Sequence, residues 1–253
     1  QIMINRKIVI KKKINNKISK LSFDNKFYEY NFINIKREKE ISINSNYLYL
    51  LPLKTVNKKT KIKVGKKNIS LNLSGIVEVK KKFEDKIYLN GISNQYLVAS
   101  LVNYKRKNQK IQVKQTKIYK VKKPWGYELW YTGKLNRNLI FKKIFIKKGT
   151  KTSLQFHKKK IETNFLFSGK AKIHFFPKRI NLVKKNYPII IKNIKTKIFS
   201  KGYAVSVPKH TVHRIEAKSD LLLYEVSTPQ PSDVIRISDD TKRGSGKIQT
   251  EHS

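Results

Sequence analysis

The chain has 253 residues, 39% hydrophobic and 29% charged, which is enough apolar sequence for one large or two ordinary packed domains and argues against disorder throughout. The absence of Cys excludes disulfide bonds and thiolate zinc sites. No apolar run approaches the roughly 20 residues of a membrane helix, and no signal peptide is recognisable, so we expect a cytoplasmic protein without membrane association.

The formal net charge is +42, from 58 Lys and Arg against 16 Asp and Glu. Only eight of the 58 are Arg, the better residue for bidentate recognition of phosphates and bases, and the lysines are spread along the whole chain. We therefore interpret the charge as a bias of composition. It still predicts non-specific binding to polyanions at low salt and the steering of anionic substrates toward the protein.

Period-two alternation of apolar and polar residues dominates the chain, and no long helical pattern is present. In chain order, the alternating segments are Tyr28–Ile35, Lys61–Val64, Ser70–Leu73, Ile76–Val79, Ile111–Val113 and Phe141–Ile146. The turn-forming sequences that separate them are Gly65–Asn68, Asn90-Gly91 and Lys148-Gly149. The sequence therefore predicts an all-β barrel or sandwich.

The two halves of the chain differ in their capacity for metal binding. All five His lie after residue 118, so residues 1–118 cannot build a histidine metal site by themselves. We expect residues 1–118 to form a structural β domain and residues 119–253 to form a second domain. The polar, basic stretch Lys105–Gln115 is a candidate connector, although Ile111 and Val113 indicate that part of it is a strand.

Two segments of the second half carry residues that suit a divalent metal. Gly149–Gly169 contains Gln155, His157 and Glu162, and positions 155 and 157 of one strand point to the same face. Gly202–Arg214 contains His213 after a strand and a short turn. Four such donors converging inside a barrel would form a metal site that suits Zn²⁺, with Mn²⁺, Fe²⁺, Co²⁺ and Ni²⁺ as alternatives.

The spacing of these residues resembles the two motifs of the cupin superfamily, G-x5-H-x-H-x4-E-x6-G and G-x5-P-x-G-x2-H. Two positions depart from the pattern, because Gln155 replaces the first His and His210 replaces the usual Gly. The positions that match are Gly149, His157, Glu162, Gly169, Gly202, Pro208 and His213. The resemblance implies a jelly-roll barrel for residues 119–253 and, with the strand rhythm of the first half, a bicupin-like protein with a degenerate N-terminal β domain.

Within the cupins, the sequence S-x-Q-x-H around Gln155 is similar to the cupin domain of type II mannose-6-phosphate isomerases. Lys123-Pro124-Trp125-Gly126 resembles that family's (R/K)-P-W-G segment, and Glu225-Val226 resembles its I-E-V strand. Arg236, Asp239 and Arg243 match its R-x-x-D-x-x-x-R pattern, so the resemblance covers about residues 119–243. Lys160 stands where the family has Arg, and Thr241-Lys242 replaces its Tyr-Gly, which leaves the substrate preference open.

The resemblance implies a metal-dependent isomerase that converts mannose 6-phosphate to fructose 6-phosphate. Such an enzyme must move a proton between two carbons and stabilise an enediolate. Candidate catalytic residues are Lys160, Glu225 and Asp239, and candidates for binding the sugar phosphate are Lys123, Lys160, Arg236 and Arg243. Of the remaining histidines, we interpret His174 as an ordinary strand residue and His252 as part of a tail.

Three other functions remain open at this point. The protein is alternatively a metal-binding cupin without enzymatic activity that binds or senses a sugar, a cupin oxygenase, or a polyanion binder driven by its charge. Gln155 argues mildly against an oxygenase, since those enzymes commonly use iron with more His ligands. We also expect that pairing of two β domains or two subunits protects exposed strand edges, so the sequence is compatible with a homodimer.

Overall fold

The structure is a computed structural model. It describes residues 9–12, 20–34, 39–41, 45–53, 59–72, 76–82, 84–90, 95–102, 104, 110–133, 138–178 and 180–252. Unit 1 draws on Gln1–Lys13, Lys120–Trp130 and Ile140–Ser253, whereas unit 2 draws on Ile14–Tyr119 and Tyr131–Leu139. The expected division of the chain into two domains, residues 1–118 and residues 119–253, stays a prediction.

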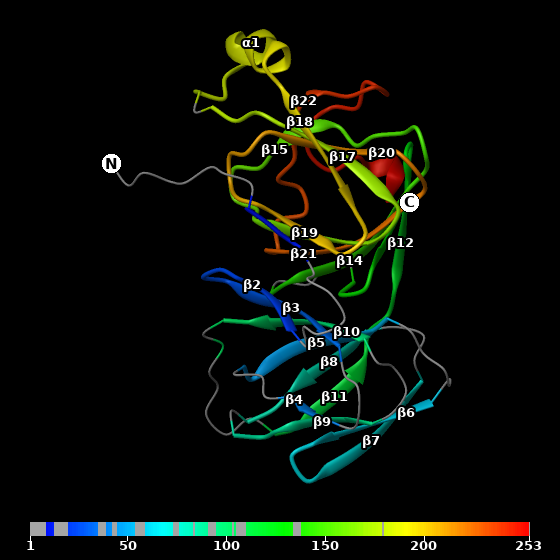
Figure 1. Ribbon diagram of the computed structural model, residues 1–253. Coiled ribbons are helices and arrows are strands. Elements are labelled where there is room, and N and C mark those ends of the chain that lie inside the picture. The colour runs from blue at the N-terminus through cyan, green and yellow to red at the C-terminus, as the bar shows by residue number, and fades with distance from the viewer. Residues whose placement is uncertain are drawn as a thin grey trace. The chain divides into compact units, whose positions relative to one another are not determined.

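Unit 1 contains two antiparallel sheets (Figure 1). In spatial order, the seven-stranded sheet consists of β1 (Val9–Lys12), β19 (Tyr203–Val207), β16 (Glu162–Ser168), β21 (Leu221–Ser227), β14 (Ile140–Ile146), β13 (Gly126–Trp130) and β12 (Tyr119–Lys123). The five-stranded sheet consists of β18 (Lys195–Ser200), β17 (Lys170–Phe175), β20 (His213–Ala217), β15 (Leu154–Phe156) and β22 (Ile235–Ser238).

The two sheets of unit 1 pack face to face through apolar side chains. Ile144, Leu166 and Leu223 from the larger sheet share one buried cluster with Ile173 and Ile215 from the smaller sheet. Burying such a side chain contributes roughly 1.5–3 kcal/mol. These contacts form the apolar part of a jelly-roll interior.

Short helices flank the strands of unit 1. They are η1 (Lys184–Asn186), α1 (Tyr187–Lys192) and η2 (Gln249–Glu251). Ile190 of α1 is fully buried in a cluster with Leu154 and Phe156 of β15. In the described part of the chain, no helix has the length and hydropathy that a membrane crossing requires.

Unit 2 also contains two antiparallel sheets. The six-stranded sheet consists of β11 (Gln112–Gln115), β8 (Val77–Lys80), β5 (Tyr47–Pro52), β10 (Gln95–Leu101), β3 (Tyr28–Asn34) and β2 (Lys20–Asp24). The four-stranded sheet consists of β4 (Lys39–Ile41), β9 (Ile87–Asn90), β6 (Lys59–Val64) and β7 (Lys67–Asn72). Leu50 and Val79 from the first sheet pack with Ile62 and Ile87 from the second.

Each alternating segment of the sequence coincides with a strand. Five of them overlap β3, β6, β7, β8 and β14, and Ile111–Val113 overlaps β11. Ile35, Leu73 and Gly91, and residues 105–109 of the candidate connector, lie outside the described residues. The prediction of an all-β fold is therefore confirmed.

Gly126 has a local conformation that only glycine adopts readily. Its φ is +150°, and a Cβ atom at this position would lie 2.1 Å from the carbonyl oxygen of Phe145. The glycine lets β13 pair closely with β14 directly after Trp125, which is buried in the apolar interior of unit 1. This explains the glycine of the K-P-W-G segment.

Candidate metal centre

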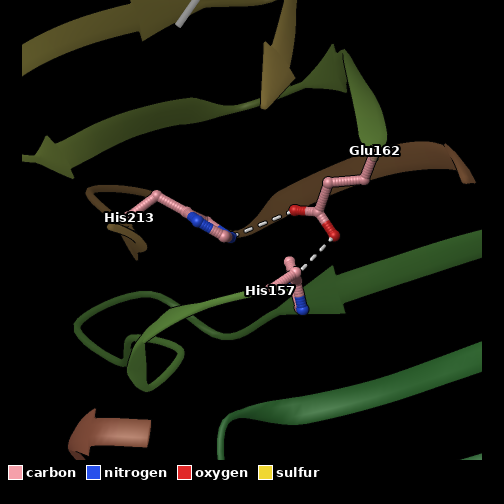
Figure 2. Close-up of side chains that lie close together, drawn as sticks. All are labelled: His157, Glu162 and His213. Atoms are coloured by element: carbon pink, nitrogen blue, oxygen red, sulfur yellow. Dashed lines mark ion pairs between the residues drawn. The ribbon is translucent and has the colours of Figure 1, made fainter. Parts of the chain in front are cut away.

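Three predicted metal ligands converge inside unit 1. Glu162 begins β16, His213 begins β20, and His157 directly follows β15. Each carboxylate oxygen of Glu162 points to one imidazole, with Nε2 of His213 at 3.2 Å and Nε2 of His157 at 3.4 Å (Figure 2). All three residues are at most 3% exposed. Two motifs that lie about 50 residues apart are thus joined at one point.

The hydrogen bonds of the two imidazoles fix which nitrogen faces Glu162. Nδ1 of His157 contacts the backbone carbonyl of Asp233, and Nδ1 of His213 lies 2.9 Å from that of Thr211. A carbonyl only accepts hydrogen bonds, so each Nδ1 is the donor and the Nε2 of a neutral ring carries a lone pair. Burial lowers the pKa of His157, which favours this neutral ring.

This arrangement places two lone pairs against a carboxylate, which is unfavourable unless a cation lies between them. Nε2 of His157 is buried without a hydrogen-bond partner. For metal–ligand bonds of about 2.1 Å, neighbouring ligand atoms lie roughly 3.0–3.4 Å apart in octahedral and tetrahedral sites. The separations of 3.2 and 3.4 Å to the two oxygens of Glu162, with one ligand atom of each residue within 4.8 Å of the others, are compatible with a single divalent ion.

Gln155, the fourth predicted ligand, lies beside this cluster. It is paired across the strands with His213, and its side chain lines the same cavity as Glu162 and His213. Its amide oxygen accepts a hydrogen bond of 2.6 Å from the hydroxyl of Ser153. The structure thus places Gln155 at the site, with its oxygen oriented by a neighbour.

Lys160 lies between two buried carboxylates. Its ammonium is 2.5 Å from Glu162 and 2.9 Å from Glu225, and all three side chains are buried. Burial alone would lower the pKa of Lys160, but the charges of the two carboxylates outweigh burial and raise it. Burial likewise opposes ionisation of Glu162, and Lys160 nevertheless holds the pKa of Glu162 well below its usual range. Lys160 is therefore a fixed cation shared by the two carboxylates.

Asp233 organises the loop that carries His157 and Lys160. Its carboxylate accepts hydrogen bonds from the backbone N–H groups of Lys158, Lys159 and Lys160, at 3.1, 2.5 and 2.8 Å. Burial opposes ionisation, but these three donors lower the pKa of Asp233. Its backbone carbonyl also holds His157. Sequence analysis did not single out Asp233, because its role depends on a contact across more than 70 residues.

A row of polar side chains continues from the cluster across the seven-stranded sheet. Trp130 of β13, Lys142 of β14, Glu225 of β21 and Asn164 of β16 are successive cross-strand partners, and all are buried. Asn164 donates a hydrogen bond of 3.3 Å to Glu162. A signal for this row was present in the sequence, since Lys142 occupies an otherwise apolar inward position of its strand.

Glu128 extends the polar row on β13. Its carboxylate lies 3.2 Å from the ammonium of Lys142 and 4.0 Å from that of Lys123. The indole N–H of Trp130 donates a 2.6 Å hydrogen bond to it. Burial raises the pKa of Glu128, but Lys142 and Lys123 outweigh this effect and lower the pKa to about 2. Charges thus alternate across the inner face of the sheet.

The polar row, together with Glu162 and His213 of the cluster, lines a cavity of about 90 Å³ within unit 1. Its apolar lining residues include Trp125, Ile144 and Leu223. Six cationic side chains line it against three carboxylates, an excess of three positive charges. The charged lining residues are Lys123, Lys142, Lys160, Arg236, Arg243, Lys247, Glu128, Glu162 and Glu225. Two carboxylates outside the lining, Asp239 and Glu251, pair with Arg243 and Lys123, so an excess of one positive charge remains and favours an anionic occupant.

The structure brings Lys123, Arg236 and Arg243 to this cavity, as predicted for substrate-binding residues, but each already has a partner. Arg236 donates to the backbone carbonyls of Gly244 and Gly246. Arg243 pairs with Asp239 at 2.7 Å, and Asp239 is not among the residues that line the cavity. Burial opposes ionisation of Asp239, but Arg243 lowers its pKa. This placement favours a structural part for Asp239 over contact with a substrate.

His252, which the sequence indicated as part of a tail, is 8% exposed and lines the cavity. Its ring meets that of Trp130 edge to face at 5.4 Å between centroids. Burial and the nearby charge of Lys123 lower the pKa of His252 to about 4, so the ring is neutral near pH 7. The interpretation as a tail is wrong because the chain folds back over the cavity.

The remaining histidines lie outside the cluster. His174, on strand β17 as expected, pairs with Glu216 at 2.7 Å. His210 lies in the turn before His213 with a φ of +58°, and its backbone N–H donates to the carbonyl of His157 at 2.7 Å. The cupin motif has Gly here, and a left-handed backbone explains that preference.

No protein-family model matches the sequence, and neither does any curated protein. The fold is similar to that of solved structures at 8–10% sequence identity. An IolB-like protein from Salmonella typhimurium has a TM-score of 0.62 at 10% identity, covering 96% of this chain and 97% of that one. Oxalate decarboxylase from Lactobacillus farciminis, in its formate complex, has a TM-score of 0.56 at 10% identity, with 84% and 80% coverage.

A third similar structure is protein YlbA from Escherichia coli, with a TM-score of 0.56 at 8% identity and coverage of 88% of this chain and 91% of that one. These neighbours have the cupin fold, which confirms the predicted all-β cupin jelly roll. The manganese centres named for Bacillus subtilis oxalate decarboxylase belong to a protein of this fold. At such identities the likeness shows the fold alone, and activity has to be argued from the site.

Proposed function

We propose that this protein is a metal-dependent aldose–ketose isomerase of a sugar phosphate, with mannose 6-phosphate and fructose 6-phosphate as the pair to test first. One observation carries the proposal. A buried donor set of two His and one Glu borders, through Glu162 and His213, a cavity lined by six cationic side chains and three carboxylates. The donors suit a divalent metal, and the charge suits a phosphate ester.

His157, Glu162 and His213 would hold the metal, with Gln155 as a further oxygen donor beside them. The metal, with zinc as first choice and manganese, iron, cobalt or nickel as alternatives, would polarise the carbonyl and hydroxyl oxygens of the open-chain sugar. Because the donor set carries one negative charge, a bound divalent ion keeps net positive charge. Lys160 adds a fixed positive charge next to the same carboxylate.

Glu225 is the carboxylate best placed to transfer the proton. It lines the cavity, whereas Asp239 does not, and Lys160 and Lys142 hold it at 2.9 and 3.8 Å. In the proposed reaction its carboxylate takes the proton from C2 of the aldose and returns it to C1 of the enediolate, while the proton of the C2 hydroxyl passes to the oxygen on C1, so that the C2 carbonyl forms. Lys142 and Lys160 orient this carboxylate, and the buried walls exclude water from the intermediate.

A coupled assay tests the proposal. Purified protein is loaded in turn with Zn²⁺, Mn²⁺ and Co²⁺ and given mannose 6-phosphate, with fructose 6-phosphate as the readout. We expect turnover that is lost in His213→Ala and falls by about 10²–10⁴-fold in Glu225→Gln. His174→Ala is the matched control, because it removes a histidine outside the cavity and should retain full activity.

Absence of turnover from protein shown to hold metal would contradict the isomerase proposal. In that case, metal-dependent sugar binding would indicate the cupin without enzymatic activity, and oxygen uptake with Fe²⁺ would indicate the oxygenase. Binding of RNA or DNA that only follows salt concentration would reflect the net charge alone.

A further inference from the structure

The carboxylate of Glu251 forms ion pairs with two of the cations that line the cavity, Lys123 and Arg243. The carboxylate oxygens of Glu251 lie 2.7 Å from the ammonium of Lys123 and 2.9 Å from the guanidinium of Arg243. The side chains of all three residues are 10% exposed. Lys123 ends β12, 128 positions before Glu251, so the contact closes a long loop of chain.

The segment that carries Glu251 forms one wall of the cavity. We call residues 249–252 the closing segment. His252 of this segment packs on Trp130. His252 and Ile248, the residue directly before the segment, both line the cavity. Within the segment, the backbone N–H of Glu251 donates to Ile248, and that of His252 donates to Gln249. The segment is thus a single helical turn from which Glu251 pairs with Lys123 and Arg243 and His252 packs on Trp130.

The charges around Glu251 show what this contact replaces. Lys123 has a second carboxylate, Glu128, only at 4.0 Å, so Glu251 is its closest counter-ion. Arg243 also pairs with a second carboxylate, Asp239, at 2.7 Å. If Glu251 withdrew, Lys123 and one edge of the guanidinium would face the cavity together. Two such cations form a binding site for a phosphate or carboxylate group.

We propose that Glu251 engages, from outside the cavity lining, the cations that the ligand's anionic group would use, and that a phosphate ester binds by exchanging with this carboxylate and releasing the closing segment. The identity of the ligand as a sugar phosphate rests on the proposed function, whereas the exchange of one anion for another rests only on the contacts of Glu251. Binding then competes with an internal ion pair, so the affinity for phosphate reports how tightly the segment is held.

Calorimetric titration with inorganic phosphate, and separately with mannose 6-phosphate, tests the exchange in the protein as purified. Glu251→Gln keeps the shape of the side chain but removes its charge, so we expect phosphate to bind about 10-fold more tightly than to the wild type. Lys123→Met should weaken binding of both probes at least 10-fold. Glu216→Gln is the matched control, since it removes the same charge from a carboxylate paired with Lys218 outside the cavity.

An equal gain in Glu251→Gln and Glu216→Gln would overturn the proposal, because net charge alone would then explain the effect. Should Glu251→Gln fail to fold, hydrogen exchange of the wild type decides the question. Phosphate should speed exchange at the amides of Glu251 and His252, and unchanged or slower exchange there would contradict release of the segment. If phosphate displaces Glu251 in protein that has no isomerase activity, this inference is supported and the proposed function is refuted.

Discussion

The two units of this protein use the same layered β architecture but fill it differently. In unit 2 the inward positions of neighbouring strands are aliphatic, with Leu48 and Leu50 on β5 and Val77 and Val79 on β8. In unit 1, three adjacent strands carry polar residues at inward positions, namely Lys142 on β14, Glu225 on β21 and Asn164 on β16. A few inward side chains therefore decide whether such a barrel is a packed core or a polar cavity.

Polar groups of unit 2 lie on the opposite face of its larger sheet. Tyr47 and Tyr49 alternate with the inward leucines of β5, and their hydroxyls are 2.8 Å apart. The hydroxyl of Tyr47 also donates to Glu78 at 2.7 Å. Burial raises the pKa of Tyr47, so the phenol stays neutral. In unit 2 these polar groups form a hydrogen-bonded layer on the face opposite the apolar interior. In unit 1, by contrast, the polar row lies on the inner face of the sheet.

Among the changes that test this contrast, we expect removal of the buried Lys160 in unit 1 to lower the free energy of unfolding the most. Lys160→Met would leave Glu162 and Glu225 buried without their closest cation, and we expect a loss of about 3–5 kcal/mol in the free energy of unfolding. Urea denaturation in the presence of a chelator measures it. Lys159→Met is the control, because Lys159 is exposed and should change stability by less than about 0.5 kcal/mol.

Truncation of an inward leucine tests whether unit 2 is a close-packed core. Leu50 is 1% exposed among aliphatic neighbours, so Leu50→Ala should cost about 2–5 kcal/mol of unfolding free energy. The same method applied to Ile189→Ala, a residue 52% exposed, should show little change. If both substitutions cost equally little, the interior of unit 2 is not packed as described. Metal affinity should be unchanged in either variant.

A smaller effect is expected from loosening the loop behind the metal ligands. Asp233→Asn would weaken the hydrogen bonds to three backbone N–H groups and should lower metal affinity by about 10–100-fold with all ligands intact. Competition with a coloured chelator measures the dissociation constant. Asp240→Asn is a suitable comparison, since its carboxylate is half exposed and pairs with Lys151 and Arg214 instead. Equal affinities in the two variants would contradict the role of Asp233.

The smallest expected effect is a loss of stability at acidic pH that is confined to unit 1. The pKa of His252 is about 4, below its ordinary value of 6.5, so the unfolded chain takes up this proton at a higher pH than the folded chain does. The stabilisation from neutral His252 is complete above about pH 6.5 and is lost as the pH falls to about 4. Hydrogen exchange should show protection in unit 1 declining over this range, and His252→Gln should reduce the decline.

Sequence patterns predicted the strands and pointed to the residues of the buried His157, Glu162 and His213 cluster, because both depend on local spacing. Period-two alternation located β3 and β14, and two short motifs located His157 and His213. The contacts of Asp233, Glu251 and His252 followed no such pattern, since each joins segments brought together only by folding. The inward polar row lay between these cases, because Lys142 is visible as a break in an apolar face while its partners across the strands are not.

Metal content of the purified protein tests the central claim most directly. Protein stripped with a chelator is dialysed against Zn²⁺ or Mn²⁺, and bound metal is counted for the wild type, His213→Ala and His174→Ala. The buried cluster predicts one ion per chain in the wild type and in His174→Ala, and loss of that ion in His213→Ala. Full occupancy in His213→Ala would contradict a metal centre at His157, Glu162 and His213.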